Sequence, residues 1–175
     1  MITRKWPKSV KSGRKWQRSS DRCTNRSMDR FRGSAPARVD EKGRLKVPSL
    51  FRVQIEEAFG PELFVTSLSG KNVLLYPLPV WQAIEEKLAS PPAVHRVKSK
   101  FLERVNYYGQ DASIDGQGRV LIPQILRDAA KLPGDVVVTG NIDHLVVSDR
   151  GALEGRLSTE DFTDEDYDEL SKALS

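Results

Sequence analysis

Cysteine and histidine are scarce in this chain of 175 residues, and their scarcity excludes several kinds of chemistry. Cys23 is the only cysteine, so no disulfide can form within the chain. Together with His95 and His144 it makes three ligands, which is fewer than the four of a usual structural zinc site. We therefore predict no metal and no cofactor, and we interpret both histidines as ordinary surface or core residues.

Long apolar runs are also absent. No stretch approaches the roughly 18 apolar residues that a membrane-spanning helix needs, and no signal-peptide segment stands near the N-terminus. Hydrophobic residues make up 38% of the chain and charged residues 30%, which is typical of soluble proteins. The single cysteine fits a reducing compartment. These features predict a cytoplasmic protein without a membrane partner.

Recognisable catalytic motifs are missing as well. Asp40 and Asp115 each precede a glycine closely, yet neither is followed by the hydroxyl residue of an Asp-Thr-Gly dyad. No serine has the glycines of a nucleophile elbow. Gly116-Gln117-Gly118 lacks the lysine and hydroxyl residue of a phosphate loop. We therefore predict that the protein is not an enzyme and has no small-molecule substrate.

The net charge of +4 is unevenly distributed. Residues 1–27 carry nine Lys or Arg against one acid, a balance of +8, so the remaining 148 residues sum to −4. This basic, Ser-rich segment lacks apolar periodicity and is predicted to be a disordered extension. A solvated tail, an organellar transit peptide, a nucleic-acid arm and a stretch translated from an early start codon, with Met28 as the alternative start, all remain open.

The chain contains one motif twice. The sequence DEKGRLKVP, from Asp40 to Pro48, corresponds to DGQGRVLIP, from Asp115 to Pro123. The register continues into the next apolar stretch, where Leu50-Phe51-Arg52 aligns with Ile125-Leu126-Arg127. A repeat at a fixed offset indicates two copies of one small unit.

Each copy has the pattern strand, Gly turn, strand, helix, hairpin and helix. One copy offers about four short strands, which are too few to close a sheet and cover its edges, and the Pro-rich linker between the copies has only about five residues. We therefore predict an α+β fold in which both units interleave into one small β-barrel-like core flanked by helices. The predicted divisions are 1–27 (basic extension), 34–82 (first unit), 83–111 (linker and connecting helix), 112–157 (second unit) and 158–175 (acidic tail).

The repeated turn has chemistry of its own. Asp caps its own backbone and Gly adopts positive φ, so the turns are expected to be shaped by Asp40, Gly43, Asp115 and Gly118. Each turn is followed at once by an arginine, and a guanidinium binds phosphate as a fork or reads guanine O6 and N7 bidentately.

We predict that Arg44 and Arg119 contact DNA, with Arg38, Lys42 and Lys46 adding phosphate contacts in the first copy. The second copy has Gln117 and Leu121 in place of the two lysines and should hold the DNA backbone less strongly. The alternative is that each Asp–Arg pair only stabilises its turn, a contribution of roughly 0–1 kcal/mol.

Three segments resemble the MraZ family: Met28 to Val47 (MDRFRGSAPARVDEKGRLKV), Leu74 to Trp81 (LLYPLPVW) and Asp115 to Pro123. The resemblance covers about residues 28 to 157. It implies a bacterial transcriptional regulator with two AbrB/SpoVT-like swapped-hairpin units, in which Arg44 and Arg119 contact DNA. The second unit lacks an aromatic residue equivalent to Trp81, which puts its closing helix in doubt.

The resemblance also implies partners and targets. Such proteins assemble into rings and act on the gene cluster for division and cell-wall synthesis. We therefore expect a nucleoid-associated repressor of that cluster, including its own promoter, that binds direct repeats in double-stranded DNA as a ring homo-oligomer. The competing interpretation is a ring-forming interaction module whose arginines bind an acidic partner, such as the segment from Glu160 to Glu169.

Overall fold

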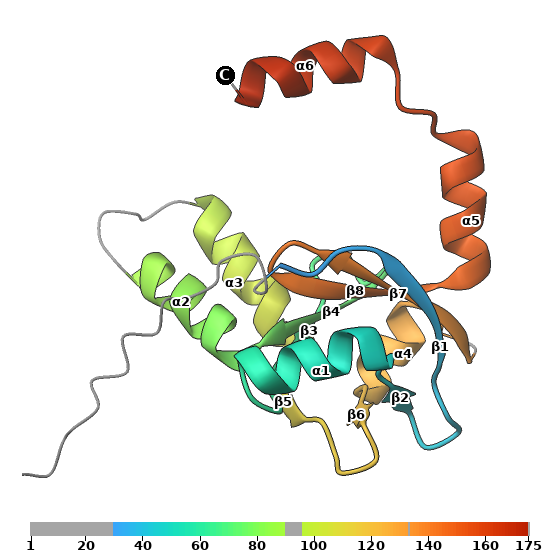
Figure 1. The fold of residues 1–175 in the computed structure, drawn as a ribbon. Coiled ribbons are helices and arrows are strands. Elements are labelled where there is room, and N and C mark those ends of the chain that lie inside the picture. Colours follow the sequence, from blue (N-terminus) through green and yellow to red (C-terminus); the bar gives the residue numbers. More distant parts are fainter. Residues whose placement is uncertain (1–29, 90–95, 133, 175) are drawn as a thin grey trace, which may run out of the picture.

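The computed structural model describes residues 30–89, 96–132 and 134–174. Within these residues the chain forms a mixed α+β fold (Figure 1). The elements of the first part are β1 (Ser34–Arg38), β2 (Arg44–Lys46), α1 (Ser49–Ala58), β3 (Glu62–Thr66), β4 (Val73–Pro77) and α2 (Leu78–Ala89). Those of the second part are α3 (Arg96–Tyr108), β5 (Gln110–Ser113), β6 (Arg119–Leu121), α4 (Gln124–Ala129), β7 (Asp135–Asn141), β8 (His144–Asp149), α5 (Arg150–Thr159) and α6 (Asp164–Leu174).

Six strands form one antiparallel sheet in the order β1-β7-β8-β4-β3-β5. Strands from before and after the segment 90–95 are interleaved in it, because β1 pairs with β7, β4 with β8 and β3 with β5. The remaining two strands, β2 and β6, pair with each other as a short ribbon, and Leu45 of β2 also forms an isolated bridge with Val39.

The predicted barrel-like core is wrong, because the described strands form an open sheet and a separate ribbon. The prediction assumed that all strands would join one sheet. Instead, the turns after β1 and β5 redirect the chain out of that sheet, and the two strands that follow meet each other. β1 and β5 therefore stand at the two edges of the sheet.

The main core lies between the sheet, the ribbon and the helices α1 and α4. Side chains alternate between the faces of a strand, and the central residues of the ribbon, Leu45 and Val120, are fully buried opposite each other. Phe51 of α1 and Leu126 of α4 are also fully buried. This packing holds the ribbon against the body of the protein while its ends carry the two turns.

A second apolar cluster joins α2 and α3 to the sheet. Trp81 of α2 stacks on Phe64 of β3 with 4.4 Å between the ring centroids, and Val105 of α3 completes the cluster. The closing helix of the second part, α5, does form, although the absent aromatic put it in doubt; it buries no residue. A side-chain cap supports it, because Asp149 accepts a 2.7 Å hydrogen bond from the Ala152 N–H.

The predicted basic extension, 1–27, lies outside the described residues, as does the Pro-rich linker. Near the start of the described residues, Phe31 is buried in the main core and makes a backbone bridge to Ile142. Among the described residues, none of the helices has both the length and the apolar character to cross a membrane.

Candidate nucleic-acid interface

The first turn, between β1 and β2, is closed by the backbone and the Asp40 carboxylate together. The Gly43 N–H donates to the Asp40 carbonyl at 2.8 Å, and Gly43 has a φ of 79°, a conformation that glycine adopts without strain. Oδ1 of Asp40 accepts from the backbone N–H groups of Lys42 and Arg44 at 3.0 and 2.8 Å. The carboxylate therefore fixes the turn before it contacts any cation.

The other carboxylate oxygen of Asp40 positions the arginine. Oδ2 accepts a hydrogen bond from Nε of Arg44 at 2.8 Å and forms an ion pair with Nη2 at 2.7 Å. Nη1 of Arg44 has no hydrogen-bond partner among the described residues. The guanidinium is thus held along one edge and keeps donors for a ligand along the other.

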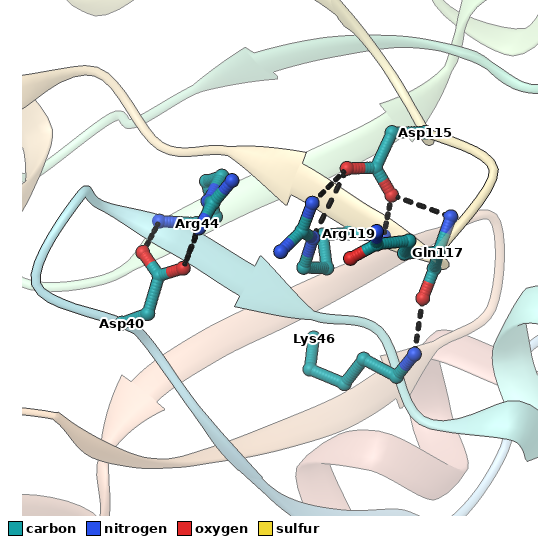
Figure 2. A network of polar contacts seen from close by, with 6 residues as sticks. All are labelled: Asp40, Arg44, Lys46, Asp115, Gln117 and Arg119. Carbon is teal, nitrogen blue, oxygen red and sulfur yellow. Dashed lines mark hydrogen bonds and ion pairs between the residues drawn. The ribbon is translucent and has the colours of Figure 1, made fainter.

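The second turn, between β5 and β6, repeats this geometry. The Gly118 N–H donates to the Asp115 carbonyl at 2.7 Å with a φ of 75° at Gly118, and Oδ1 of Asp115 accepts from the N–H groups of Gln117 and Arg119, both at 2.9 Å. Oδ2 accepts from Nε and Nη2 of Arg119 at 3.0 and 2.9 Å. Both Asp–Arg pairs predicted from the repeat are therefore present (Figure 2).

The hydrogen bonds lower the pKa of both aspartates. The pKa of Asp40 lies below its usual value chiefly because of the side-chain hydrogen bond from Arg44. The pKa of Asp115 is also lowered, but there the backbone N–H of Arg119 is the largest cause. Both carboxylates are therefore charged at neutral pH, and the two arginines are oriented by full ion pairs.

The ribbon brings the two turns together. Arg44 pairs with Leu121 and Lys46 pairs with Arg119 across β2 and β6, so these four side chains share the face opposite the buried Leu45 and Val120. Figure 1 shows both turns projecting from the same edge of the molecule, away from α5 and α6. Residues 75 positions apart in the sequence thus form one surface.

Further contacts tie each turn to the other half of the chain. The Val47 N–H donates to the Gly118 carbonyl at 3.0 Å, and the Ile122 N–H donates to the Gly43 carbonyl at 2.8 Å. Nζ of Lys46 donates to the Gln117 carbonyl, as Figure 2 shows. The predicted phosphate contact Lys46 is therefore engaged within the protein, where it links the end of β2 to the second turn.

Two arginines that were not predicted as site residues lie against the glycines. The Arg127 side chain of α4 lies over Gly43, where a Cβ atom would stand 2.6 Å from its Cζ. The Arg52 side chain of α1 lies over Gly118 in the same way, 2.7 Å from Nη1. The repeat aligns Arg52 with Arg127, and this alignment could have indicated that the two residues have equivalent roles. No local pattern shows that each side chain would reach the turn of the other copy.

The surroundings of the two turns differ. A hollow of about 720 Å³ lies beside the first turn, and Arg38, Lys42, Arg44 and Arg127 are among its lining residues. Arg38 is 80% exposed in its side chain and pairs only distantly with Asp135, at 3.7 Å. Asp40 and Glu41 line the hollow as well, so four basic side chains lie there with two acidic ones, whereas the second turn has the uncharged Gly116 and Gln117 in place of Glu41 and Lys42.

No cluster of His, Cys, Asp or Glu in the described part of the chain has the arrangement of a metal site. The polar side chains brought together on the exposed face of the ribbon are two guanidinium groups and one ammonium group, and the carboxylates that hold the guanidinium groups also accept backbone hydrogen bonds. Such a surface offers donors for an anion such as phosphate and for the acceptor edge of guanine.

Comparison with known proteins identifies similar chains. A family model described as "MraZ protein, putative antitoxin-like" matches residues 110–168. A protein of Acidobacterium capsulatum named Transcriptional regulator MraZ is 48% identical over 142 residues, covering 81% of this chain and 97% of the relative. A protein of the same name in Koribacter versatilis is 46% identical over 142 residues, covering 81% of this chain and 97% of the relative. Another, in Methylococcus capsulatus, is 36% identical over 110 residues, covering 63% of this chain and 72% of the relative.

Proposed function

Because the chain belongs to the MraZ family, we propose that it is a DNA-binding transcriptional regulator that reads a specific sequence through Arg44 and Arg119. The relatives carry the name of a transcriptional regulator, and the prediction that the chain is not an enzyme is confirmed by that family membership. The resemblance inferred from three sequence segments is confirmed as well.

The observation that carries the proposal is the pair of oriented arginines on one ribbon. Each guanidinium is held by an aspartate along the edge formed by Nε and Nη2, and each keeps Nη1 available. A two-stranded β-ribbon fits the major groove of B-DNA. An arginine that is held in position loses little conformational entropy on binding, which favours bidentate recognition of guanine.

The remaining cations have separate roles in this proposal. Lys42 sits at the tip of the first turn and the Arg38 side chain is largely exposed, so both are placed for phosphate contacts. Lys46 is a positioning residue, because its ammonium group holds the Gln117 carbonyl of the second turn. Asp40, Gly43, Asp115 and Gly118 shape the turns and orient the arginines.

We further propose that residues 34–82 and 112–157 act as two AbrB/SpoVT-like units, joined by 83–111 and followed by the acidic tail 158–175. The 148 residues after the basic segment sum to −4, so one copy has a weak general attraction for DNA. A ring of copies that engages direct repeats would gain affinity through avidity. The proposed targets are the division and cell-wall gene cluster and its own promoter, with repression in the cytoplasm at the nucleoid.

The test is fluorescence anisotropy of the full chain, and of a version starting at Met28, against the DNA upstream of its own gene. A scrambled duplex is the specificity control, and a salt series reports phosphate contacts. Selective, salt-sensitive binding is expected from both versions. Equal binding to both duplexes would exclude sequence reading, and binding that requires residues 1–27 would place the contact in the basic segment.

A second function is favoured by the exposed acidic helix α6. In that alternative the arginines bind an acidic partner and DNA is not the ligand. Replacing both Arg44 and Arg119 by Ala separates the two functions. A DNA regulator loses operator binding, whereas an interaction module keeps whatever DNA affinity it had.

A further inference from the structure

The C-terminal helix α6 has an apolar face that no other described part of its own chain covers. Tyr167, Leu170 and Leu174 recur at i, i+3 and i+7 and so line one side of the helix. Their exposed fractions are 68%, 47% and 79%. Figure 1 shows α6 standing away from the sheet, connected to it through α5. Packing of such a face is the usual source of a helix's stability.

The sequence nevertheless specifies α6 as a helix with a defined start. The backbone N–H and the hydroxyl of Thr163 donate to Oδ2 of Asp166 at 2.9 and 2.8 Å, and the Asp166 N–H donates back to that hydroxyl at 3.2 Å. This is the arrangement of a capping box. Asp164 and Glu165 add negative charge to the first turn, where the helix dipole favours it. A capped amphipathic helix with an open apolar face has the form of a docking element.

Acidic side chains border that face. Successive residues of a helix are rotated by about 100°, so Asp164 and Asp168 lie on one side of the stripe formed by Tyr167, Leu170 and Leu174. Asp166 lies on the other side. From residue 158 to the end, seven acids stand against one lysine. A complementary surface is therefore apolar at its centre and basic at its borders.

The outer side of α3 has this character. The helix has four basic residues and one acid. Arg96, Lys100 and Arg104 recur every four residues along its exposed side. Val97 and Tyr107 lie on the same side, and they are 76% and 66% exposed. Basic and apolar groups are thus interleaved over the length of α3, as acidic and apolar groups are on α6.

A hollow at the C-terminal end of α3 offers a place for an aromatic side chain of the partner copy. It has a volume of about 280 Å³ and is lined by Lys100, Glu103, Arg104, Tyr107 and Tyr108. Tyrosine rings pack on other aromatic rings, and basic groups lie favourably over ring faces. Phe162 is 65% exposed just before α6 and packs edge-on against Tyr167, with 5.9 Å between the ring centroids. Two aromatic side chains at the start of α6 are therefore available to enter the hollow.

The two surfaces do not cover each other within one chain. All residues from 158 to 174 are exposed, and so are Val97 and Tyr107 of α3. Within residues 30–89, 96–132 and 134–174, every copy therefore carries both complementary surfaces and covers neither of them. We propose that α6 of one copy docks through its apolar stripe on the outer side of α3 of a second copy.

Such a contact joins two different surfaces, so it is heterologous and leaves each bound copy with one free α3 and one free α6. Contacts of this kind close into rings or extend into filaments. The inference rests on the self-association proposed above and identifies the elements that make it. It does not depend on DNA binding, because the ribbon projects from the opposite edge of the molecule (Figure 1).

The test is the mass of the full chain across a concentration series, measured by sedimentation equilibrium and native mass spectrometry. One variant reverses the charge along one border of the apolar stripe of α6 (Asp164→Lys with Asp168→Lys). Another reverses the charge at two positions on the outer side of α3 (Arg96→Glu with Lys100→Glu). Each is expected to raise the concentration of half-assembly by about tenfold or more, because like charges then face each other. Helix content by circular dichroism checks that both variants remain folded.

The decisive step is to mix the two variants. The reversed border of α6 in the first variant fits the reversed side of α3 in the second, and the unchanged α6 of the second fits the unchanged α3 of the first. The mixture is therefore expected to assemble although neither variant does alone. The matched control, Glu165→Lys with Glu169→Lys, makes the same charge change on the opposite side of α6. It is expected to shift half-assembly by less than about threefold.

The outcomes separate this inference from the proposed function. If the wild type assembles and neither reversed variant changes its mass, the α3–α6 contact is refuted while self-association stands. If the wild type remains a 19.7 kDa monomer at every concentration, self-association and the contact both fail. Assembly that is lost in both variants but not recovered on mixing would also refute the pairing. DNA binding is measured separately in each case.

Discussion

The two turns of the ribbon share a backbone but differ in their surroundings. In both, an aspartate accepts two backbone N–H groups and holds an arginine, and a glycine with φ between 75° and 79° closes the turn. In the first turn Glu41 precedes a lysine at the tip, beside a hollow of about 720 Å³ that is lined by four basic and two acidic residues. The second has Gln117 at the equivalent position.

The difference also extends to the arginines that lie over the glycines. Arg52, over the second turn, pairs with Glu56 through a 2.8 Å hydrogen bond from Nε. Arg127, over the first turn, makes only a longer 3.2 Å bond, to the Ile122 carbonyl, and lines the hollow. The geometry that orients Arg44 and Arg119 is thus duplicated, whereas the charge around it is not. Base reading should therefore be shared by the turns, and phosphate binding should be concentrated at the first.

The largest expected effect tests whether the two arginines are equivalent. Arg44→Ala and Arg119→Ala should each weaken operator binding by about 1–3 kcal/mol, the value of a bidentate guanine contact. Binding to a scrambled duplex should change little. Anisotropy on both duplexes measures this. If one substitution costs tenfold more affinity than the other, the duplicated geometry does not carry duplicated function.

A second test breaks the shared backbone. Gly43→Ala and Gly118→Ala should each destabilise the protein by roughly 1–2 kcal/mol, because an L-residue is strained at positive φ. Gly118→Ala should cost more, since the new Cβ displaces Arg52 from its bond to Glu56. Urea unfolding gives the free energies.

Gly116→Ala is the matched control for both substitutions. Gly116 lies in the second turn without positive φ, and no atom lies within 4 Å of a Cβ placed there. The free energy of unfolding of the Gly116→Ala variant should differ from that of the wild type by no more than about 0.5 kcal/mol. A loss at Gly116 equal to that at Gly118 would show that positive φ is not what these turns require.

A third test exchanges the charge at the turn tips. Lys42→Gln should lower the slope of log affinity against log salt by about 0.9, and Gln117→Lys should raise it by about the same amount. The double substitution should restore the wild-type slope. An unchanged slope for Lys42→Gln would remove Lys42 from the phosphate contacts.

The repeated turn could be predicted from the sequence because its chemistry is local. Asp, Gly and Arg at fixed spacing specify capping, positive φ and an ion pair within five residues, and the structure has all three at Asp40–Arg44 and Asp115–Arg119. The acidic character of the segment 158–175, which contains α6, was likewise readable from its composition. The local structure within each segment could therefore be predicted from the sequence.

What the segments do across long distances was not accessible. The pairing of Leu45 with Val120 and the bond from Lys46 to Gln117 join residues about 70 or more positions apart. Hydrophobic alternation shows that a strand has a buried face, but it does not show which strand lies beside it. The barrel prediction failed for this reason, and the crossing of Arg52 and Arg127 to opposite turns was missed for the same reason.

The smallest expected effect separates the two aspartates by the cause of their lowered pKa. In Asp40 the side-chain bond from Arg44 is the largest cause, whereas in Asp115 it is the backbone N–H of Arg119. Arg44→Ala should therefore raise the pKa of Asp40 more than Arg119→Ala raises that of Asp115. Carboxyl chemical shifts followed by NMR during an acid titration measure both values.

The same titration gives the sign of the effect on stability. A carboxylate whose pKa is lowered on folding stabilises the folded state fully above its ordinary pKa of 3.8, and that stabilisation is lost as the pH falls through the lower folded value. Asp40→Asn should remove this acid dependence at the first turn, as should Arg44→Ala in large part. At the second turn, Arg119→Ala should retain most of it, because the backbone N–H of residue 119 survives the substitution. Equal losses in the two arginine variants would mean that side-chain ion pairs, and not the turn backbone, hold both carboxylates.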